Sequence, residues 1–295
     1  MEEFETYRPL LFSIAYRMLG SASEAEDMVQ ETYLRARLAE DAEIRSLKSY
    51  LTTIITRLCL DELKSARVQR EQYIGPWLPE PLLTTDAGAA LEERETVSMA
   101  FLVLLEELTP PERAVFLLHE VFNYPYEDIG EMIGKNAAAC RQLFHRAQLR
   151  LAEHRPRFEA SREDQLDLTA RFLMACQSGN VQELTTMLAQ DVVAWSDGGG
   201  KVSAALRPVA GRERVIRLIL GVQHKMPVNY MFSAEELNGA PALLAWLDGQ
   251  LTDLFIFEVA QERIQRLYTI RNPDKLAHLQ RQLHLRDSSP VPPTR

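Results

Sequence analysis

Hydrophobic residues recur at helical spacing through the first seventy positions of the chain. Residues 4–19 form an amphipathic stretch that Gly20 ends, and the capping box at 23–26, Ser-Glu-Ala-Glu, opens a helix that runs to about Glu40. A third helix is predicted from about Ser46 to Arg70. Its centre is β-branched, but the long flanking pattern without Gly or Pro favours helix. The pattern therefore predicts an all-α domain over residues 1–71.

A second helical region carries the signals of a helix-turn-helix. Thr109 can cap a helix whose first position is Pro110, and Glu112 completes a capping box. A short helix is predicted from Tyr126 to Ile133, ended by Gly134. Asn136 then caps a helix that begins at Ala137 and has its apolar stripe at Cys140, Phe144, Ala147 and Leu151. Such a helix can enter a DNA major groove.

The other side of this last helix is polar and basic. Arg141 and Gln142 suit bidentate base contacts, and Lys135 and Arg146 suit phosphates. Residues 135–157 contain six Lys or Arg and one acidic residue. The predicted DNA contacts here are Lys135, Asn136, Arg141, Gln142, His145 and Arg146. A helical hairpin with a solvated basic face is the alternative at this point.

Composition limits the classes of protein that fit. A chain of 295 residues is expected to form two or three domains, and its net charge of −9 disfavours nonspecific coating of nucleic acid. Cys59, Cys140 and Cys176 are far apart in apolar patterns, which favours buried thiols over a metal site or a disulfide. The acidic N-terminus is not a signal peptide, and no apolar run is long enough to span a membrane. We expect a cytoplasmic protein with no membrane contact, metal or cofactor.

The C-terminal part changes from helical to strand patterns. A helix is predicted at 162–177, and a short helix that ends at Ala189 follows it. Further helices are predicted at 211–224 and after the cap Asn272-Pro273-Asp274. Strands are predicted at Val192–Ser196, Val202–Val209, Val228–Glu235, Leu243–Leu247, Leu251–Ala260 and Ile264–Arg271. The turn signals are Asp197-Gly198-Gly199-Gly200 and Asp248-Gly249. These elements predict an α+β domain with a curved antiparallel sheet over residues 160–286, followed by a flexible tail at 287–295.

A proline-rich linker at residues 72–92 separates the two helical regions. Gly75-Pro76-Trp77-Leu78-Pro79-Glu80-Pro81 cannot continue a helix and favours an extended path. A Trp and a Leu in such a segment suit a groove, so the linker is predicted to dock on another domain of this chain. A linker that packs only on its own domain is the alternative.

Three motifs in order resemble the extracytoplasmic-function sigma factors of bacterial RNA polymerase. SASEAEDMVQETYLRA is similar to the polymerase-binding helix of that family, SYLTTIITRLCLDELKSAR to its promoter-melting helix, and residues 108–147 to its promoter-upstream reader. Leu38 stands where many members have Trp. The resemblance implies a first domain at 1–71 that meets the polymerase and the −10 element, and a helix-turn-helix domain at 93–157 for the −35 element.

The resemblance also assigns roles to residues. It implies that the residues around Leu38–Lys48 and the helix after them handle the −10 element. The predicted polymerase contacts are Asp27, Gln30, Glu31 and Arg35. The basic residues of the melting helix that are predicted to contact DNA are Arg57, Lys64 and Arg67; a solvated helix face is the alternative for these three.

Three further motifs resemble a subgroup of these sigma factors that carries a fused SnoaL-like domain. They are WLPEP at 77–81, DGGGK at 197–201 and NPDKL at 272–276. The predicted interdomain regulatory residues are Trp77, Leu78, Pro79, Glu80, Pro81, Asp197, Gly198, Gly199, Gly200, Lys201, Asn272, Pro273 and Asp274. Two all-α sigma domains followed by an α+β cone are therefore expected, and the third domain is predicted to regulate the first two.

The partners expected for such a sigma factor are core RNA polymerase and promoter DNA, with no separate anti-sigma factor required. Whether the C-terminal domain binds a small molecule is left open by the sequence. Catalysis would need a carboxylate or His in an apolar cavity, and the polar candidates are Asp191, Asp197, Tyr230, Tyr268 and His224. No catalytic residue is assigned, and no enzyme is expected. The alternatives are a SnoaL-type isomerase or cyclase with a DNA-binding region, and a ligand-sensing regulator that acts without polymerase.

Overall fold

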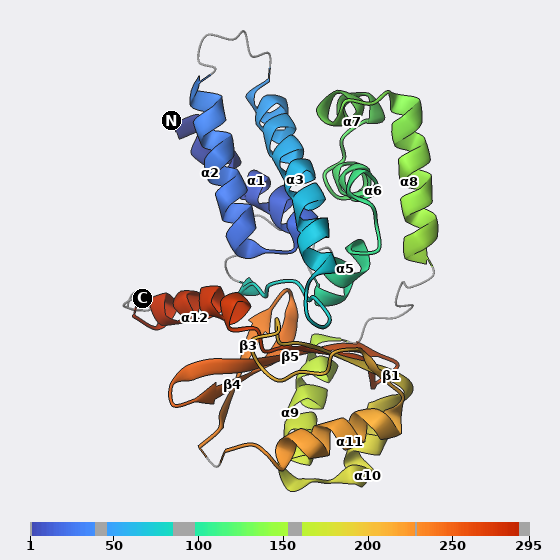
Figure 1. Ribbon diagram of the computed structural model, residues 1–295, viewed down its shortest axis with the longest axis vertical. Coiled ribbons are helices and arrows are strands. Elements are labelled where there is room, and N and C mark those ends of the chain that lie inside the picture. Colours follow the sequence, from blue (N-terminus) through green and yellow to red (C-terminus); the bar gives the residue numbers. More distant parts are fainter. Residues whose placement is uncertain (1, 39–45, 85–97, 153–160, 228, 289–295) are drawn as a thin grey trace. The chain divides into compact units, whose positions relative to one another are not determined.

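The chain forms two compact units whose sequences are interleaved. The computed structural model describes residues 2–38, 46–84, 98–152, 161–227 and 229–288. The helical unit takes residues 1–72 and 85–155, and the C-terminal unit takes residues 73–84 and 156–295. We call residues 73–84 the strap. The strap follows the helical unit's third helix in the chain but belongs to the C-terminal unit (Figure 1).

The helical unit begins with three long helices, α1 (Glu2–Leu19), α2 (Ala22–Leu38) and α3 (Leu47–Glu71). Gly20 has a φ of 69° and ends α1 as predicted. The cap of α2 is Ser21 and not the predicted Ser23, because the Ser21 hydroxyl accepts the Glu24 backbone N–H at 3.2 Å. Two neighbouring serines offer the same local signal, and only the position of the preceding turn decides between them.

The helix-turn-helix was predicted correctly. It comprises α5 (Met99–Leu105), α6 (Pro110–Phe116), a π-helical turn (Leu117–Val121) that the sequence did not indicate, α7 (Tyr126–Ile133) and α8 (Ala137–Ala152). The Glu112 carboxylate accepts the Thr109 backbone N–H at 3.0 Å, which confirms the capping box. Gly134 adopts a left-handed conformation at the end of α7, and the expected apolar stripe of α8 is buried. Helix α3 packs on α6 and α7, so both helical groups belong to one unit.

The C-terminal unit is a six-stranded sheet with helices on both sides (Figure 1). The strand order is β2-β1-β6-β5-β4-β3, with bounds Val209–Ala210, Leu188–Asp197, Arg263–Ile270, Gln250–Ala260, Ala240–Leu247 and Met231–Leu237. The sheet is mixed and not purely antiparallel, because β1 and β6 pair in parallel. Its helices are α9 (Arg162–Ser178), α10 (Val181–Met187), α11 (Arg212–Gln223) and α12 (Pro273–Ser288).

Two details of the predicted strands and helices were wrong. The apolar run Val202–Val209 forms only the short strand β2 at its end, because residues 198–202 close a tight turn in which Lys201 and Val202 donate to the Gly198 carbonyl. The helical pattern of residues 162–177 also places Leu166 on the inward side with Phe172, but Leu166 is 45% exposed. Residues 289–295, which include most of the predicted tail, lie outside the described residues, as do the predicted −10 contacts at 39–45.

One hydrophobic core lies between the sheet and helices α9 to α11. Phe172 on α9 meets Phe257 on β5 with ring centroids 4.9 Å apart, and Val215 on α11 is fully buried beside them. Helix α12 lies on the other side of the sheet and contacts β5 (Figure 1). This helix carries the third of the motifs that indicated a regulatory domain.

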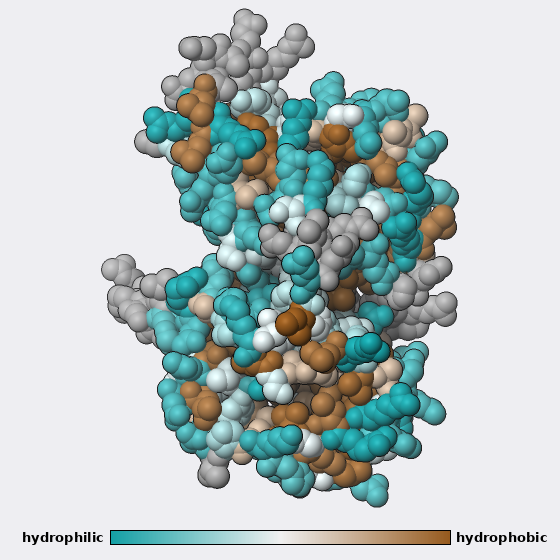
Figure 2. Space-filling view, in the orientation of Figure 1, coloured by the Kyte–Doolittle hydropathy of each residue, from teal (hydrophilic) through white to brown (hydrophobic). Residues whose placement is uncertain are grey.

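The surfaces of the two units differ in character. On the face drawn in Figure 2, the helical unit is mostly hydrophilic, whereas hydrophobic residues gather on the C-terminal unit. The exposed large hydrophobic residues of the C-terminal unit include Ile74, Leu166, Met174, Val181, Val202, Leu206, Val222 and Met231. Among the helices that the structure describes, none is long and apolar enough to cross a membrane.

Candidate functional site

Helix α8 presents a polar side that is open to solvent. Arg141, Gln142, His145 and Arg146 are all exposed, and the preceding Lys135 and Asn136 are exposed as well. The Asn136 side chain accepts the Ala139 backbone N–H at 2.8 Å, so it caps the helix as predicted. All six DNA-contact residues predicted for this region therefore lie along the start and one side of α8.

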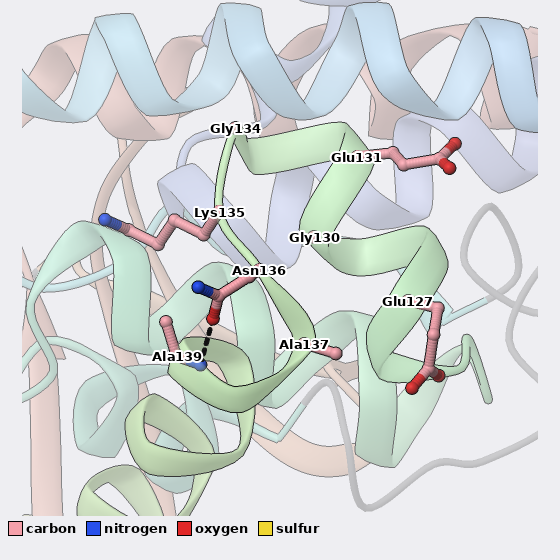
Figure 3. Close-up of a pocket in the computed structure, with 8 residues that line it drawn as sticks. All are labelled: Glu127, Gly130, Glu131, Gly134, Lys135, Asn136, Ala137 and Ala139. Carbon is pink, nitrogen blue, oxygen red and sulfur yellow. Dashed lines mark hydrogen bonds between the residues drawn. The ribbon is translucent and has the colours of Figure 1, made fainter.

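A hollow of about 690 Å³ opens beside the N-terminus of α8 (Figure 3). Its lining residues are Glu127, Gly130, Glu131, Gly134, Lys135, Asn136, Ala137 and Ala139. A Cβ at Gly130 would lie 2.5 Å from the Lys135 carbonyl oxygen, so α7 can approach this turn only without a side chain there. The small alanines and the positive end of the helix dipole suit an anionic group such as a phosphate.

Two of the predicted base and phosphate contacts have partners within the helical unit. The Arg141 guanidinium lies 3.0 Å from the Glu127 carboxylate and over the Tyr126 ring. Arg146 lies 3.9 Å from Glu112. Because the two arginines are 56% and 59% exposed, water screens these ion pairs and the side chains remain available to a ligand.

The predicted DNA contacts on α3 are not equivalent. Lys64 is exposed and pairs with Asp61 at 2.8 Å, while the side chain of Arg67 lies outside the described residues. Arg57 instead donates its Nε to the Met132 carbonyl at 2.8 Å and an Nη to the Glu131 carbonyl at 2.9 Å. In this structure Arg57 therefore contacts helix α7.

The predicted polymerase contacts form a polar stripe on α2, made of Asp27, Gln30, Glu31 and Arg35. Asp27, Gln30 and Arg35 are exposed, Glu31 is half-buried, and Arg35 pairs with Glu31 at 2.7 Å. The opposite side of α2 is buried through Ala25 and Val29. The polar stripe therefore lies on the side of α2 away from its packed side.

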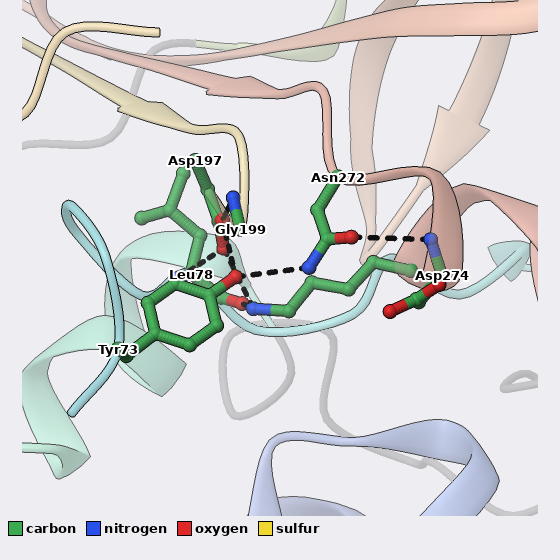
Figure 4. Close-up of polar contacts among 7 residues, drawn as sticks. Tyr73, Leu78, Asp197, Gly199, Asn272 and Asp274 are labelled. Atoms are coloured by element: carbon green, nitrogen blue, oxygen red, sulfur yellow. Dashed lines mark hydrogen bonds and ion pairs between the residues drawn. The ribbon is translucent and has the colours of Figure 1, made fainter. Parts of the chain in front are cut away.

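The strap is held in the C-terminal unit by the carboxylate of Asp197 at the end of β1 (Figure 4). Asp197 is fully buried. Its Oδ1 accepts the Tyr73 hydroxyl at 2.5 Å, and its Oδ2 accepts the Leu78 backbone N–H at 2.9 Å. The carboxylate also orders its own turn, because Oδ1 accepts the Gly199 N–H at 3.1 Å.

Lys275 supplies the positive charge for this buried carboxylate. Its Nζ lies 2.7 Å from Asp197 Oδ2 and also donates to the Leu78 carbonyl. The ammonium sits 4.1 Å from the centre of the Trp77 ring and 5.3 Å from that of Tyr73, within range of cation–π attraction. Burial, together with the hydrogen bond to Asp197, raises the pKa of Tyr73 above its ordinary value. We call Tyr73, Trp77, Leu78, Asp197 and Lys275 the strap anchor.

A second contact holds the far end of the strap. The Leu82 backbone N–H donates to the Asn238 side chain at 3.0 Å, and the Asn238 N–H donates back to the Leu82 carbonyl at 2.9 Å. Leu83 forms an isolated bridge with Leu237 at the end of β3. The strap thus pairs with the β3–β4 turn like a short added strand.

The three motifs that predicted regulatory contact meet in this unit. Lys201 forms an ion pair with Asp274, and Asn272 packs on the Cα of Gly199, whose φ of 60° also favours glycine. Asn272 caps α12 by accepting the Asp274 N–H at 3.1 Å, and Pro273 is the first residue of that helix. Sequence reasoning missed Tyr73, Lys275 and Asn238, although Lys275 lies inside the NPDKL motif.

The polar residues considered for catalysis do not come together. Asp191 and His224 are exposed on different elements. Tyr230 donates to Asp253, and its pKa is raised to about 12, chiefly by burial. Tyr268 stacks on Trp195 with centroids 5.4 Å apart. Across the described ranges, no group of three His, Cys, Asp or Glu residues could hold a metal ion.

Two segments of the helical unit match known protein families. Residues 4–68 match the family model of sigma-70 region 2, and residues 98–151 match that of sigma-70 region 4. The chain is 35% identical over 291 residues to the ECF RNA polymerase sigma factor SigJ of Mycobacterium tuberculosis, covering 93% of this chain and 92% of that protein. It is 32% identical to the probable ECF sigma factor SigI of the same species, over 95% and 96% of the two chains.

A solved structure extends the similarity to the fold. The crystal structure of Mycobacterium tuberculosis SigJ matches with a TM-score of 0.76 at 31% identity, covering 94% of this chain and 98% of that one. The match includes the C-terminal α+β unit as well as the two helical regions. The chain therefore belongs to the ECF sigma factors of RNA polymerase.

Proposed function

We propose that the exposed side of α8 gives this sigma factor its promoter specificity by reading the −35 element. Arg141 and Gln142 would contact base edges, while Lys135, Asn136, His145 and Arg146 would position the helix on the backbone. The observation that carries the proposal is the continuous polar side of α8 beside the open hollow at its N-terminus. Helix α3, with the residues around Leu38–Lys48, would act at the −10 element.

The polar stripe of α2 is proposed to bind core polymerase. Exposed charges contribute little in water, but a desolvated cluster at an interface can carry much of an affinity. The chain's net charge of −9 disfavours stable binding to DNA alone. Polymerase would therefore supply most of the promoter affinity, and the complex would act in the cytoplasm.

The C-terminal unit is proposed to regulate the sigma unit through the strap. The strap starts only two residues after α3 ends, so a strap anchored on Asp197 and Lys275 limits how far the helices before and after it can separate. Regulation within one chain would make a separate anti-sigma factor unnecessary. No catalytic role is proposed for the SnoaL-like domain.

A selection from random DNA tests this proposal. The full chain is mixed with core polymerase and a library of random duplexes, and bound duplexes are sequenced. Two motifs with a fixed spacing should be enriched only when polymerase is present. Replacing Asp27, Gln30 and Glu31 together by Ala should abolish the enrichment, while Glu163→Ala and Asp167→Ala on the exposed side of α9 serve as a matched loss of charge.

The outcomes separate the remaining functions. Enrichment of one motif by the chain without polymerase would make it an operator-binding regulator. Enrichment that depends on an added small molecule would assign ligand sensing to the C-terminal unit. Unchanged enrichment in the α2 variant would refute the assigned polymerase interface.

A further inference from the structure

One basic side chain of α3 is used as a cap for a helix of the other sigma region. Arg57 forms two hydrogen bonds through its guanidinium, to the carbonyl oxygens of Met132 at 2.8 Å and of Glu131 at 2.9 Å. Both acceptors are backbone atoms in the last turn of α7. Arg57 belongs to the segment that matches region 2, and α7 to the segment that matches region 4.

The end of α7 needs such a donor. The last four carbonyls of a helix have no partner within the helix, and the dipole makes that end negative. The Gly130 carbonyl accepts backbone N–H groups from Gly134 and Lys135. The next two carbonyls, those of Glu131 and Met132, accept hydrogen bonds from Arg57. The planar fork of a guanidinium can serve both, whereas an ammonium is a single point charge.

A few other polar contacts join the same two regions. The Thr52 hydroxyl and the Tyr124 hydroxyl lie 3.0 Å apart in a buried site, and Arg113 donates to the Met18 carbonyl at 2.7 Å. Lys48 lies 5.7 Å from the centre of the Tyr124 ring. These directional bonds join the two regions alongside the packing of α3 on α6 and α7.

Promoter binding through both regions is incompatible with these contacts. The −10 and −35 elements are separated by about 25 base pairs, or roughly 85 Å along B-form DNA at about 3.4 Å per base pair. Arg57 cannot remain within 3 Å of the helix-turn-helix while α3 and α8 engage two such distant elements. The Arg57 contact therefore belongs to a closed state of the helical unit.

We propose that Arg57 has two alternative partners, the carbonyl end of α7 in the closed state and a promoter phosphate in the open state. The Arg57 guanidinium can bind either partner but not both at once. Promoter DNA therefore competes directly for Arg57, which holds the two sigma regions together in the closed state. The competition lies within the helical unit and acts in addition to the strap. The inference rests on the proposed function only in placing α3 and α8 at the two promoter elements.

Two substitutions separate the two partners. Arg57→Lys keeps the charge for a phosphate but loses the fork, and Arg57→Gln loses both. Tyr124→Phe removes the neighbouring hydroxyl bond without touching a residue proposed to bind DNA. Opening is measured by electron–electron distance in the full chain with spin labels on Asp61→Cys and Gln148→Cys, two exposed positions. Cys176→Ser removes the partly exposed native thiol, while Cys59 and Cys140 are buried.

The parent should give one short distance. Loss of charged hydrogen bonds should raise the open-to-closed ratio about tenfold in Arg57→Lys and Arg57→Gln, and less in Tyr124→Phe. Promoter-dependent run-off transcription with core polymerase should be kept or raised in Tyr124→Phe, and lowered severalfold in Arg57→Gln. It should fall less in Arg57→Lys, which keeps a positive charge for the phosphate.

Each departure has a definite meaning. A distance distribution in Arg57→Lys and Arg57→Gln identical to that of the parent would refute the closed-state contact. Full transcription with Arg57→Gln would refute the phosphate contact. A parent that neither binds core polymerase nor initiates transcription would instead refute the proposed function, and the distance measurement would still report on the closed state.

Discussion

Replacing Lys275 by Met should release the strap from the C-terminal unit. Lys275 is 5% exposed, and its partner Asp197 is fully buried. Removing one member of a buried ion pair typically costs about 3–5 kcal/mol, because the other charge is left without compensation. Asp197 would still accept hydrogen bonds from Tyr73, Leu78 and Gly199. We therefore expect the lower end of that range, about 3 kcal/mol, which is roughly a hundredfold in the released fraction.

Hydrogen exchange in the full chain measures this release directly. The Leu78 and Leu82 amides are bonded only while the strap is docked, to Asp197 and Asn238 respectively. Their protection should fall about a hundredfold in Lys275→Met. Lys201→Met is the matched control, since Lys201 is 53% exposed and its ion pair with Asp274 contributes at most about 1 kcal/mol.

A double variant checks the cause. Asp197→Asn combined with Lys275→Met removes both charges and should recover part of the protection, because no unpaired charge remains buried. Strap protection in Lys275→Met equal to that in Lys201→Met would refute the reasoning. Equal loss in the single and double variants would show that shape, and not charge, holds the strap.

Further predictions concern the two interfaces and the buried sheet. Arg141→Ala and Gln142→Ala in the holoenzyme should each reduce discrimination at one −35 position by about 1–3 kcal/mol in competition binding, and an unchanged sequence preference would contradict the assignment. Replacing Asp27, Gln30 and Glu31 of the polar stripe together by Ala should abolish co-purification with core polymerase, while the melting temperature changes little. An equal loss of folding would show that these residues have a structural role. Burial raises the pKa of Glu258 despite the opposing charge of Arg266. The neutral Glu258 carboxyl therefore stabilises the fold fully below the unfolded pKa near 4.3, and this stabilisation is lost as pH rises. Glu258→Gln should therefore gain stability relative to the parent as pH rises above about 4.3, and a stability difference that stays constant with pH in denaturant unfolding would show that this is wrong.

Local chemistry explains what could be predicted from the sequence. The bounds of α7 follow from Gly134 and the cap of α8 from Asn136, both signals within a few residues of the feature that they determine. The exposed side of α8 and the polar stripe of α2 follow from helical periodicity. Motif resemblance placed WLPEP, DGGGK and NPDKL in one functional group, and the structure brings them together in one unit.

Tertiary pairing explains what was missed. Lys275 and Asp197 are 78 residues apart, and nothing near either residue indicates the other. The parallel pairing of β1 with β6 depends on how the whole sheet is wound, which periodicity does not encode. Arg57 looks like any basic residue on a helix surface, and only the packing of α3 on α7 reveals its carbonyl partners.

The position of the strap in the chain has a consequence during synthesis. The strap leaves the ribosome well before its binding site exists, because Lys275 follows Leu78 by 197 residues. At about 5–20 residues per second, the anchor would be completed roughly 10–40 s after the strap appears. Once the helix-turn-helix has also been made, both nascent sigma regions are present for the rest of that interval without the domain proposed to restrain them. A newly made chain would therefore pass through a brief unrestrained period, and translation speed downstream of the strap would set its length.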